Sequence, residues 1–226
     1  MLNANDKIIE EYSFVENFIN NNKQNQGYLI PFNLFEYFFN QAKNNDKIKD
    51  PTAFCLATCQ SNLPDARILL LKHFDQNGFV FFTNKNSKKA NDIALNSNAA
   101  MCFYWDEIGV QVRIKGVVKQ TNQLESDKYF ASRSFESKIG AIVSKQSSVL
   151  ECRKKFVDEY NSYCKNLQNN ANGNKINLTC PLNWGGYRIT PSEIEFWHDR
   201  PFRLHDRTVF TLDTNSASWK ITKLYP

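Results

Sequence analysis

Short apolar runs separated by tight polar turns place the strongest constraint on how this chain can fold. Residues 53–58, 67–73 and 79–83 are rich in large apolar side chains, and segments containing Asn, Asp, Gly or Pro lie between them. Runs of this length bounded by turn-forming residues are typical of β-strands, and tight turns join antiparallel neighbours. The sequence therefore predicts an antiparallel meander in this part of the chain.

Further strands are predicted along the chain, with helices inserted between them. Strand signals recur at residues 100–105, 110–118, 186–190, 193–198, 207–212 and 219–224. Helical patterns occur at residues 33–43, 87–95, 122–132, 134–144 and 148–164. Asn33 with Glu36 and Ser148 with Glu151 have the spacing of capping boxes at the starts of the first and last of these helices. Because strands and helices do not alternate regularly, a doubly wound fold is disfavoured. We predict a mainly β, α+β protein: an antiparallel closed or split β-barrel with helices packed around it.

The length of 226 residues fits one compact domain with an added arm. Residues 1–45 are predicted to form an N-terminal arm and helix, and residues 46–226 the barrel domain. The Asn-rich stretch near 166–180 is predicted to be a flexible surface loop.

Composition disfavours several partners and locations. The net charge of +5 is mild, and no dense Lys/Arg run indicates nucleic-acid binding. The N-terminus is polar, and no apolar run is long enough to span a bilayer. The six Cys and three His show no metal-site spacing, so we expect no metal and free thiols in a reducing cytoplasm.

Two stretches are candidate anion sites because they place cations beside apolar strands. Arg67 and Lys72 stand at the two ends of the apolar run Ile68-Leu69-Leu70-Leu71. Thr83 precedes a turn and a helix start that carries Lys88 and Lys89, where free N–H groups favour a phosphate. The alternatives are snorkelling strand-end cations and an ordinary capped helix with solvated lysines.

Tyr129, Arg133 and Ser137 are spaced by four residues and would share one face of a continuous helix. Two hydroxyls and a guanidinium could then form a cup for a phosphate. Four-residue spacing is also common on ordinary helix surfaces, so this alternative stays open.

Residues 197–207 form the densest cluster of charged and aromatic side chains in the chain. Alternation in an extended segment would place Arg203, His205 and Arg207 on one face. Three such groups repel one another unless an anionic ligand or carboxylates offset them. The segment is therefore either an anion site or a salt-bridge network with Asp199 and Asp206.

These segments occur in an order that resembles the pyridoxamine/pyridoxine 5'-phosphate oxidase family from about Asp50 to Pro226. The matching motifs are Arg67-Ile-Leu-Leu-Leu-Lys72, Phe82-Thr83-Asn84, Ser87-Lys-Lys-Ala90, Gln111-Val-Arg113, Tyr129-Phe-Ala-Ser-Arg133, Ser137-Lys-Ile-Gly140, Ser144-Lys-Gln-Ser-Ser148, Trp184-Gly-Gly186, Ile194-Glu-Phe-Trp197 and Arg203-Leu-His-Asp-Arg207. Each motif alone is weak, but together they cover most of the chain.

The resemblance implies a split-barrel homodimer that binds FMN at the subunit interface. It implies oxidation of pyridoxamine or pyridoxine 5'-phosphate to pyridoxal 5'-phosphate, with oxygen reduced to hydrogen peroxide. It also implies FMN contacts from Arg67, Ile68, Leu69, Leu70, Leu71, Lys72, Phe82, Thr83, Lys88, Lys89, Gln111, Gln146, Ser147, Trp197 and Arg207. The implied substrate residues are Lys72, Tyr129, Arg133, Ser137, Arg203 and His205, with Arg203 and His205 at the catalytic centre.

Three positions differ from the family pattern. No Arg precedes Arg67, so the Arg-x-x-Tyr element that the family often carries near its N-terminus is absent. Lys88 stands where the family usually has Arg, which predicts somewhat weaker FMN binding. Val110 stands where an Arg usually precedes Gln111. Two alternatives remain: another flavin oxidoreductase on the same barrel, and a non-catalytic protein that binds FMN or pyridoxal phosphate.

Overall fold

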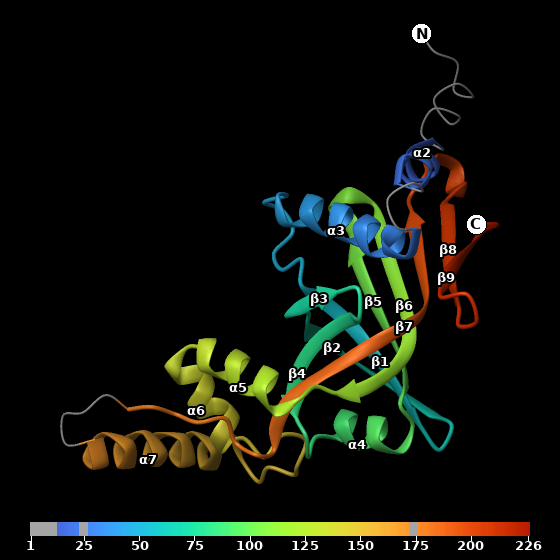
Figure 1. Ribbon diagram of the computed structural model, residues 1–226. Coiled ribbons are helices and arrows are strands. Elements are labelled where there is room, and N and C mark those ends of the chain that lie inside the picture. The colour runs from blue at the N-terminus through green and yellow to red at the C-terminus, as the bar shows by residue number, and fades with distance from the viewer. Residues whose placement is uncertain (1–12, 23–26, 172–175) are drawn as a thin grey trace.

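The computed structural model describes residues 13–22, 27–171 and 176–226. Its strands form one nine-stranded sheet that curls into a barrel, and helices cover its ends and one side (Figure 1). The first residues of the predicted arm, 1–12, and residues 172–175 of the predicted loop lie outside the described parts. The boundary proposed near residue 45 stays a prediction.

Every strand pairs with its neighbours in an antiparallel sense. The strands are β1 (Ala53–Gln60), β2 (Leu63–Leu70), β3 (His73–Asp75), β4 (Gly78–Asn84), β5 (Asn98–Trp105), β6 (Val110–Gln120), β7 (Trp184–His198), β8 (Asp206–Asp213) and β9 (Ser218–Leu224). The helices are α2 (Ser13–Asn22), α3 (Ile30–Lys43), α4 (Lys88–Leu95), α5 (Gln123–Ser132), α6 (Phe135–Val143) and α7 (Arg153–Ala171), with short 3-10 helices η1 (Gly27–Leu29), η2 (Asp106–Ile108) and η3 (Pro201–Arg203). The sheet order is β2-β1-β5-β6-β7-β4-β3, with β8 beside β7 and β9 beside β8.

The 15-residue strand β7 divides the barrel. β6 pairs with β7 along its length, while β4 pairs with its first half and β8 with its second half. The two strands predicted at 186–190 and 193–198 are therefore one strand. The pairing of β6 with β7 shifts register at Gly116, and this shift lets β7 bend. A Cβ on residue 116 would lie 2.1 Å from Thr190 O, so only glycine fits at this position. The predicted antiparallel split barrel with surrounding helices is confirmed.

The β1–β2 hairpin turns in only two residues. Gln60 pairs with Leu63, and both Ser61 and Asn62 have positive φ, at 50° and 61°, which defines a type I′ turn. The sequence predicted a longer turn over 60–65 and a strand over 67–73. β2 instead starts at Leu63, and Pro64 is tolerated because β2 is an edge strand.

β2 also ends earlier than predicted. After Leu70 the backbone changes partner: Leu71 N donates to Thr52 O, and Lys72 N donates to Val80 O. The chain thus crosses from the β1 side to the β4 side of the barrel. This crossing puts Leu71 in the core and leaves Lys72 exposed beside β4.

The type I′ turn supports a stability prediction. A Ser61→Asn, Asn62→Gly double variant should raise the free energy of unfolding by about 1 kcal/mol, because Asn and Gly tolerate positive φ better. For a chain of this size that is roughly 2–4 °C in Tm, measurable by calorimetry. Ser61→Ala should lower Tm instead, and a rise there would contradict the turn assignment.

Aromatic side chains from α3 fill one end of the barrel. Phe35 and Phe38 are buried against Phe79, Phe103 and Phe196 of the sheet. The capping box predicted at Asn33 and Glu36 is wrong, because the helix already begins at Ile30 with Pro31 in its first turn.

A second apolar cluster lies where α5, α6 and α7 gather beside the barrel (Figure 1). Tyr160, Tyr163, Cys164 and Leu167 of α7 pack against it at helical spacing. Two predictions fail here. The helix does not start at the Ser148–Glu151 box but at Arg153, and it continues to Ala171, so residues 166–171 are helical and not a loop.

Candidate functional site

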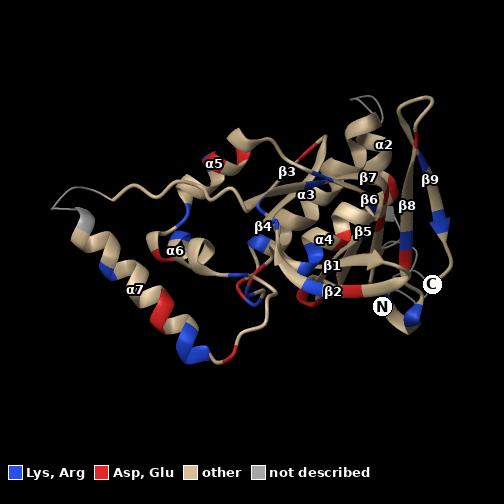
Figure 2. Cartoon of the chain, turned by 90° about the horizontal axis from the view of Figure 1, so that it is seen from below, with Lys and Arg blue, Asp and Glu red and all other residues tan. Residues whose placement is uncertain are grey.

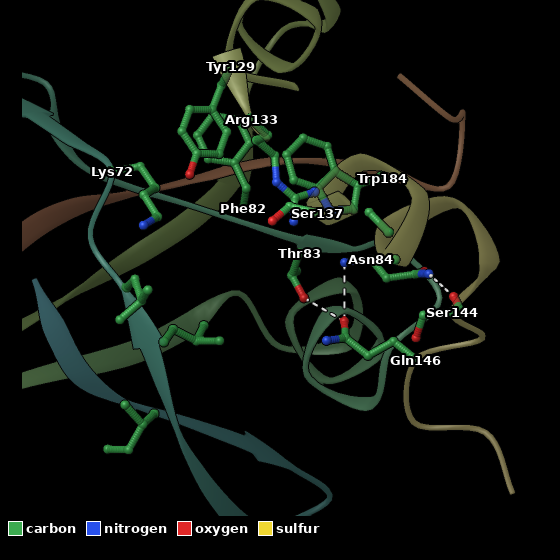
Figure 3. Close-up of a pocket in the computed structure, with 15 residues that line it drawn as sticks. Lys72, Phe82, Thr83, Asn84, Tyr129, Arg133, Ser137, Ser144, Gln146 and Trp184 are labelled. Carbon is green, nitrogen blue, oxygen red and sulfur yellow. Dashed lines mark hydrogen bonds between the residues drawn. The ribbon is translucent and has the colours of Figure 1, made fainter. Parts of the chain in front are cut away.

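A cavity of about 490 Å³ lies between the barrel and helices α5 and α6 (Figure 3). β2, β4, the two helices and the loop after α6 all contribute side chains to its wall. Ten residues that the sequence singled out line it: Ile68, Leu69, Leu70, Lys72, Phe82, Thr83, Tyr129, Arg133, Ser137 and Gln146. Ile68 and Leu70 are exposed, so the cavity has an apolar rim beside its polar groups.

Arg133 stands between two helices, as the separate predicted ranges 122–132 and 134–144 indicate, and not on one continuous helix. Arg133 ends α5 with an extended backbone, and the Ser134 hydroxyl then caps α6 by accepting a hydrogen bond from Ser137 N. Tyr129, Arg133 and Ser137 therefore come from two helices and a helix end. They still line one cavity, on the side where Lys72 also lies (Figure 3).

The Arg133 side chain is partly buried, and no described carboxylate forms an ion pair with it. Its Cζ lies 4.9 Å from the ring centre of Trp184 and 5.9 Å from that of Phe130. Within the described residues, Nη1 is buried and has no hydrogen-bond partner. Burial lowers the pKa of Arg133 and raises that of Tyr129. A cation held on aromatic faces with an unused donor attracts an anion.

Trp184 was not singled out as a site residue, yet it shapes this cavity. Phe82 stacks against both Tyr129 and Trp184, with ring centroids at 4.1 Å and 5.3 Å. The sequence did carry a signal for Trp184, since a large aromatic side chain at the start of a strand packs on its neighbours. Trp184 therefore acts as a platform that orients Arg133.

The loop after α6 is tied to the end of β4 through Gln146. Gln146 Oε1 accepts hydrogen bonds from Thr83 Oγ1 at 2.9 Å and from Asn84 N at 3.3 Å. The Asn84 amide in turn donates to Ser144 O at 3.2 Å. These bonds are drawn in Figure 3. Ser147 follows in the same loop with φ of 72°.

Lys89 adds a second buried cation next to Thr83. Its side chain is 7% exposed, and Nζ donates to Thr83 Oγ1 and Ser87 Oγ, both at 3.3 Å. None of the described carboxylates forms an ion pair with it. Burial, followed by the nearby Arg67 charge, lowers the pKa of Lys89. The start of α4 therefore favours an incoming anion.

Arg67 and Lys88 are held by two carboxylates. Asp65 Oδ2 lies 2.7 Å from Arg67 Nη2 and 3.1 Å from Lys88 Nζ. Asp92, only 1% exposed, accepts from Thr58 Oγ1 at 2.8 Å and from Lys88 Nζ at 3.2 Å. Figure 2 shows basic and acidic positions close together along β2 and α4. Lys88 is thus already neutralised, unlike Lys89.

Arg67 nevertheless keeps an unused donor. Its Nη1 donates to Thr58 Oγ1 and Leu56 O, whereas its buried Nη2 has no hydrogen bond to any described residue, despite the nearby Asp65 oxygen. The contact with Asp65 is therefore electrostatic and lacks hydrogen-bond geometry. Arg67 and Lys89 could both give further bonds to an anion.

The other predicted site residues lie elsewhere in the fold. Gln111, Trp197 and Arg207 are register partners across β6, β7 and β8. Glu195, which is 2% exposed, lies on the same face and pairs with Arg207 and Arg113, both at 2.7 Å. The sequence did not single out Glu195, although it shares a face with Trp197 two residues on.

Arg203 and His205 lie beside this second group. His205 Nδ1 is 3.0 Å from Asp199 Oδ1, and its ring centre is 4.6 Å from that of Trp197. Arg203 is exposed at a turn where Phe202 and Arg203 have φ of 60° and 62°. The extended conformation predicted for 203–207 is therefore found only from Asp206, which is buried and paired with Lys223 at 3.0 Å.

Within one chain, the cavity residues lie far from the group formed by Gln111, Trp197, Arg207 and their neighbours. Trp184 stands at the cavity, and Trp197 stands at the opposite end of the same strand. Thirteen residues of extended chain span roughly 40 Å along the strand. A single copy thus carries two separate half-sites: the cavity with its cations, and the β6–β8 surface with Arg203 and His205.

The described parts of the chain show neither a membrane-spanning helix nor a metal site. No described helix is both long and apolar enough to cross a membrane. No group of three or more His, Cys, Asp or Glu within the described residues is arranged to hold a metal ion. All six cysteines are free thiols.

Comparison with known families matches most of the chain. Residues 41–161 match the family model described as pyridoxamine 5'-phosphate oxidase, and residues 184–226 match that of the pyridoxine 5'-phosphate oxidase C-terminal dimerisation region. A pyridoxine/pyridoxamine 5'-phosphate oxidase from Burkholderia mallei is 45% identical over 87% of this chain and 89% of its own length. Another from Brucella canis is 46% identical over 87% of this chain and 94% of its own.

Solved structures share the fold. PhzG from Burkholderia lata 383, in complex with tetrahydrophenazine-1-carboxylic acid, superposes with a TM-score of 0.78 at 28% identity, over 87% of this chain and 92% of PhzG. A pyridoxamine 5'-phosphate oxidase-related, FMN-binding protein from Nostoc punctiforme gives a TM-score of 0.66 at 16% identity, over 86% and 96% of the two chains. The second likeness concerns the fold alone.

Proposed function

Because the chain belongs to the pyridoxamine 5'-phosphate oxidase family, we propose that it oxidises pyridoxamine or pyridoxine 5'-phosphate to pyridoxal 5'-phosphate with FMN as cofactor. One observation carries this proposal. Arg133 lines the cavity, while Lys89 contacts the lining residue Thr83 and Arg67 precedes the lining residue Ile68. Arg133 and Arg67 each keep a buried donor that has no hydrogen-bond partner among the described residues. A cofactor and a substrate that each carry a phosphate would each use one set of cations, Lys89 with Arg67 or Arg133.

The chain's residues fit FMN. Lys89, Arg67 and the start of α4 offer positive charge and free donors for a phosphate. The exposed apolar side chains Ile68 and Leu70 offer a surface for the flavin ring. Thr83 and Gln146 would add polar contacts, with further contacts from Leu69, Leu71, Lys72, Phe82, Lys88 and Ser147.

The substrate phosphate would lie at the other end of the cavity. Arg133 supplies a partly buried guanidinium, and Tyr129, Ser137 and Lys72 line the same cavity. The unfavourable burial of Arg133 in the free protein would be relieved by a bound dianion. Phosphate binding would position the rest of the substrate, which is the main requirement for hydride transfer.

A homodimer would complete the site. The C-terminal match is to a dimerisation region, and it covers the strands β7, β8 and β9 that carry the second half-site. We propose that each cavity receives Gln111, Trp197, Arg203, His205 and Arg207 from the second copy. Arg203 and His205 would then contact the substrate as the catalytic residues, and Trp197 and Arg207 would contact FMN.

FMN, when bound, would accept the hydride lost from the substrate carbon and pass the electrons to oxygen, giving hydrogen peroxide. The chain's own residues would bind and orient. Arg133 would fix the phosphate end, and Arg203 would clamp the ring. His205, oriented by Asp199 and Trp197, would hydrogen-bond a polar group of the substrate. We expect the enzyme to work in the cytoplasm.

The PhzG structure raises a second candidate, because that protein binds a tricyclic carboxylic acid. Two sets of cations in and beside one cavity favour a phosphorylated substrate here. A binding protein without turnover is the third candidate. The purified protein should show a flavin spectrum after reconstitution with FMN, and addition of pyridoxamine 5'-phosphate in air should release peroxide.

The outcomes of that assay separate the candidates. Flavin binding without peroxide from either B6 phosphate would support the binding protein. Oxidation of a tetrahydrophenazine carboxylate but not of the phosphates would support the second candidate. Failure to bind FMN at all would refute the proposed function.

Lys89→Met should raise the Kd for FMN about tenfold at neutral pH, because a charge-assisted bond to the phosphate is lost. The free protein's Lys89 has a lowered pKa, and a bound phosphate would raise it again. FMN affinity should therefore fall as pH rises through the free-state pKa. This alkaline fall should be absent in Lys89→Met, as measured by flavin fluorescence titration.

Lys88→Met is the matched control. Its hydrogen bond to Asp65 is the main cause that raises the pKa of Lys88, so Lys88 stays charged where Lys89 loses its proton. Lys88→Met should keep the alkaline fall. An identical pH profile for wild type and Lys89→Met would contradict the role of Lys89.

A further inference from the structure

Asp65 occupies an unusual position for a carboxylate in a site built for anions. It lies on edge strand β2, and a single oxygen, Oδ2, stands 2.7 Å from Arg67 Nη2 and 3.1 Å from Lys88 Nζ. One anionic oxygen between a guanidinium and an ammonium is the arrangement that a phosphate oxygen takes in a cationic site. Asp65 thus fills the place of a ligand oxygen.

The surrounding contacts show that this carboxylate is replaceable. Arg67 keeps two hydrogen bonds through Nη1, and Lys88 keeps Asp92 at 3.2 Å, so both cations stay anchored without Asp65. Arg67 Nη2 makes no hydrogen bond with a described residue, so Asp65 at 2.7 Å and Asp92 at 3.7 Å hold it by charge alone. Asp65 is also partly exposed, with 37% of its side chain accessible, and can turn towards solvent.

Asp92 differs from Asp65 in each of these respects. It is 1% exposed, and it accepts a hydrogen bond from Thr58 at 2.8 Å as well as pairing with Lys88. Asp92 is therefore a fixed structural counter-ion. Lys89, the remaining cation of the group, pairs with neither carboxylate and contacts Thr83 and Ser87.

We propose that Asp65 is an internal competitor of the FMN phosphate. Its carboxylate holds Arg67 and Lys88 in the cofactor-free protein, and the phosphate displaces it when FMN binds. This inference rests on the proposed function, since it concerns the same cofactor site. Asp65 thereby sets how tightly the cofactor is held: binding must break two ion pairs, and the displaced carboxylate still repels the phosphate.

The test compares FMN with riboflavin, which lacks the phosphate. Asp65→Asn should lower the Kd for FMN roughly threefold to tenfold, the size of effect expected from one partly exposed charge pair. The Kd for riboflavin should not change. The difference between Asp65→Asn and wild type should shrink at high salt, because Asp65 is reached by solvent. All values come from fluorescence titration of the cofactor-free protein.

Two further variants make the result specific. Asp158→Asn removes the same charge from an exposed pair with Lys154 on α7, and it should leave both Kd values unchanged. Asp65→Ser should reproduce the effect of Asp65→Asn without an amide. Weaker FMN binding in both Asp65 variants would overturn the proposal, because Asp65 would then organise the site. Equal tightening for FMN and riboflavin would also overturn it.

These outcomes are distinct from failure of the proposed function. If wild type and Asp65→Asn both lack FMN binding, the cofactor assignment itself is refuted. If both bind FMN equally well, the cofactor assignment stands and the competitor role of Asp65 is refuted.

Discussion

Arg133→Met is expected to raise the KM for pyridoxamine 5'-phosphate about a hundredfold, while kcat changes by only a few fold. The guanidinium packs on Trp184 and Phe130, and its buried Nη1 has no hydrogen-bond partner among the described residues. Its charge-assisted bonds to a phosphate are worth about 3 kcal/mol together, which corresponds to a factor of about one hundred. The bound phosphate is remote from the reacting carbon, so substrate and transition state should lose the contact equally.

The preference for phosphorylated over unphosphorylated substrate provides a second test of the role of Arg133. Wild type should prefer the phosphorylated substrate to pyridoxamine itself, and Arg133→Met should lose most of that preference in kcat/KM. Arg153→Met, the same change at the exposed start of α7, is the control and should behave as wild type. A large fall in kcat at unchanged KM would show that Arg133 acts in the chemical step and not in phosphate binding.

Glu195→Gln is expected to lower the free energy of unfolding by about 3 kcal/mol. The carboxylate is 2% exposed and lies between Arg113 and Arg207, with both pairs at 2.7 Å. Neutralising one partner of a buried ion network leaves the remaining charges uncompensated, and such losses cost about 3–5 kcal/mol. Chemical denaturation followed by tryptophan fluorescence would measure the change.

A neighbouring position offers a matched control. Glu193 stands two residues earlier on the same strand and pairs with Lys115 at 2.7 Å, but 28% of its side chain is exposed. Glu193→Gln should cost less than about 1 kcal/mol, because solvent screens that pair. Equal losses for the two variants would mean that burial of Glu195 does not determine its contribution. Glu195→Gln should also weaken FMN binding, since Arg207 loses the group that orients it.

Ten residues singled out from the sequence line one cavity, and they lie in or next to strands and helices with clear local signals. Alternation along β2 separates Arg67 and Leu69 from the more exposed Ile68 and Leu70, as the structure shows. Alternation tells which face a side chain occupies but not which end of the barrel it reaches. The separation of Trp197 and Arg207 from Arg133 could therefore not be predicted from pattern alone.

The failed predictions come from local signals that tertiary contacts override. Ser148 and Glu151 have capping-box spacing, but Val149 between them is fully exposed, so no apolar contact holds a helix turn there. The preceding loop is instead held by Gln146 and Asn84. The sequence did not single out Glu195 for a related reason. Its partners Arg113 and Arg207 lie on two other strands, so its burial depends on how the sheet is assembled and not on the residues next to it in the sequence.

The position of β7 also has a consequence for how the chain folds as it is synthesised. β7 lies between β6 and β4, so the edges of both strands have no partner there until residues 184–198 have been made. Pairing across about a hundred residues, as between Phe79 and Ile189, raises contact order and slows barrel closure. Until then the nascent chain exposes two open strand edges, which are the parts of a β-protein most prone to aggregate. The most aggregation-prone stage of synthesis should therefore be the interval before residue 198 leaves the ribosome.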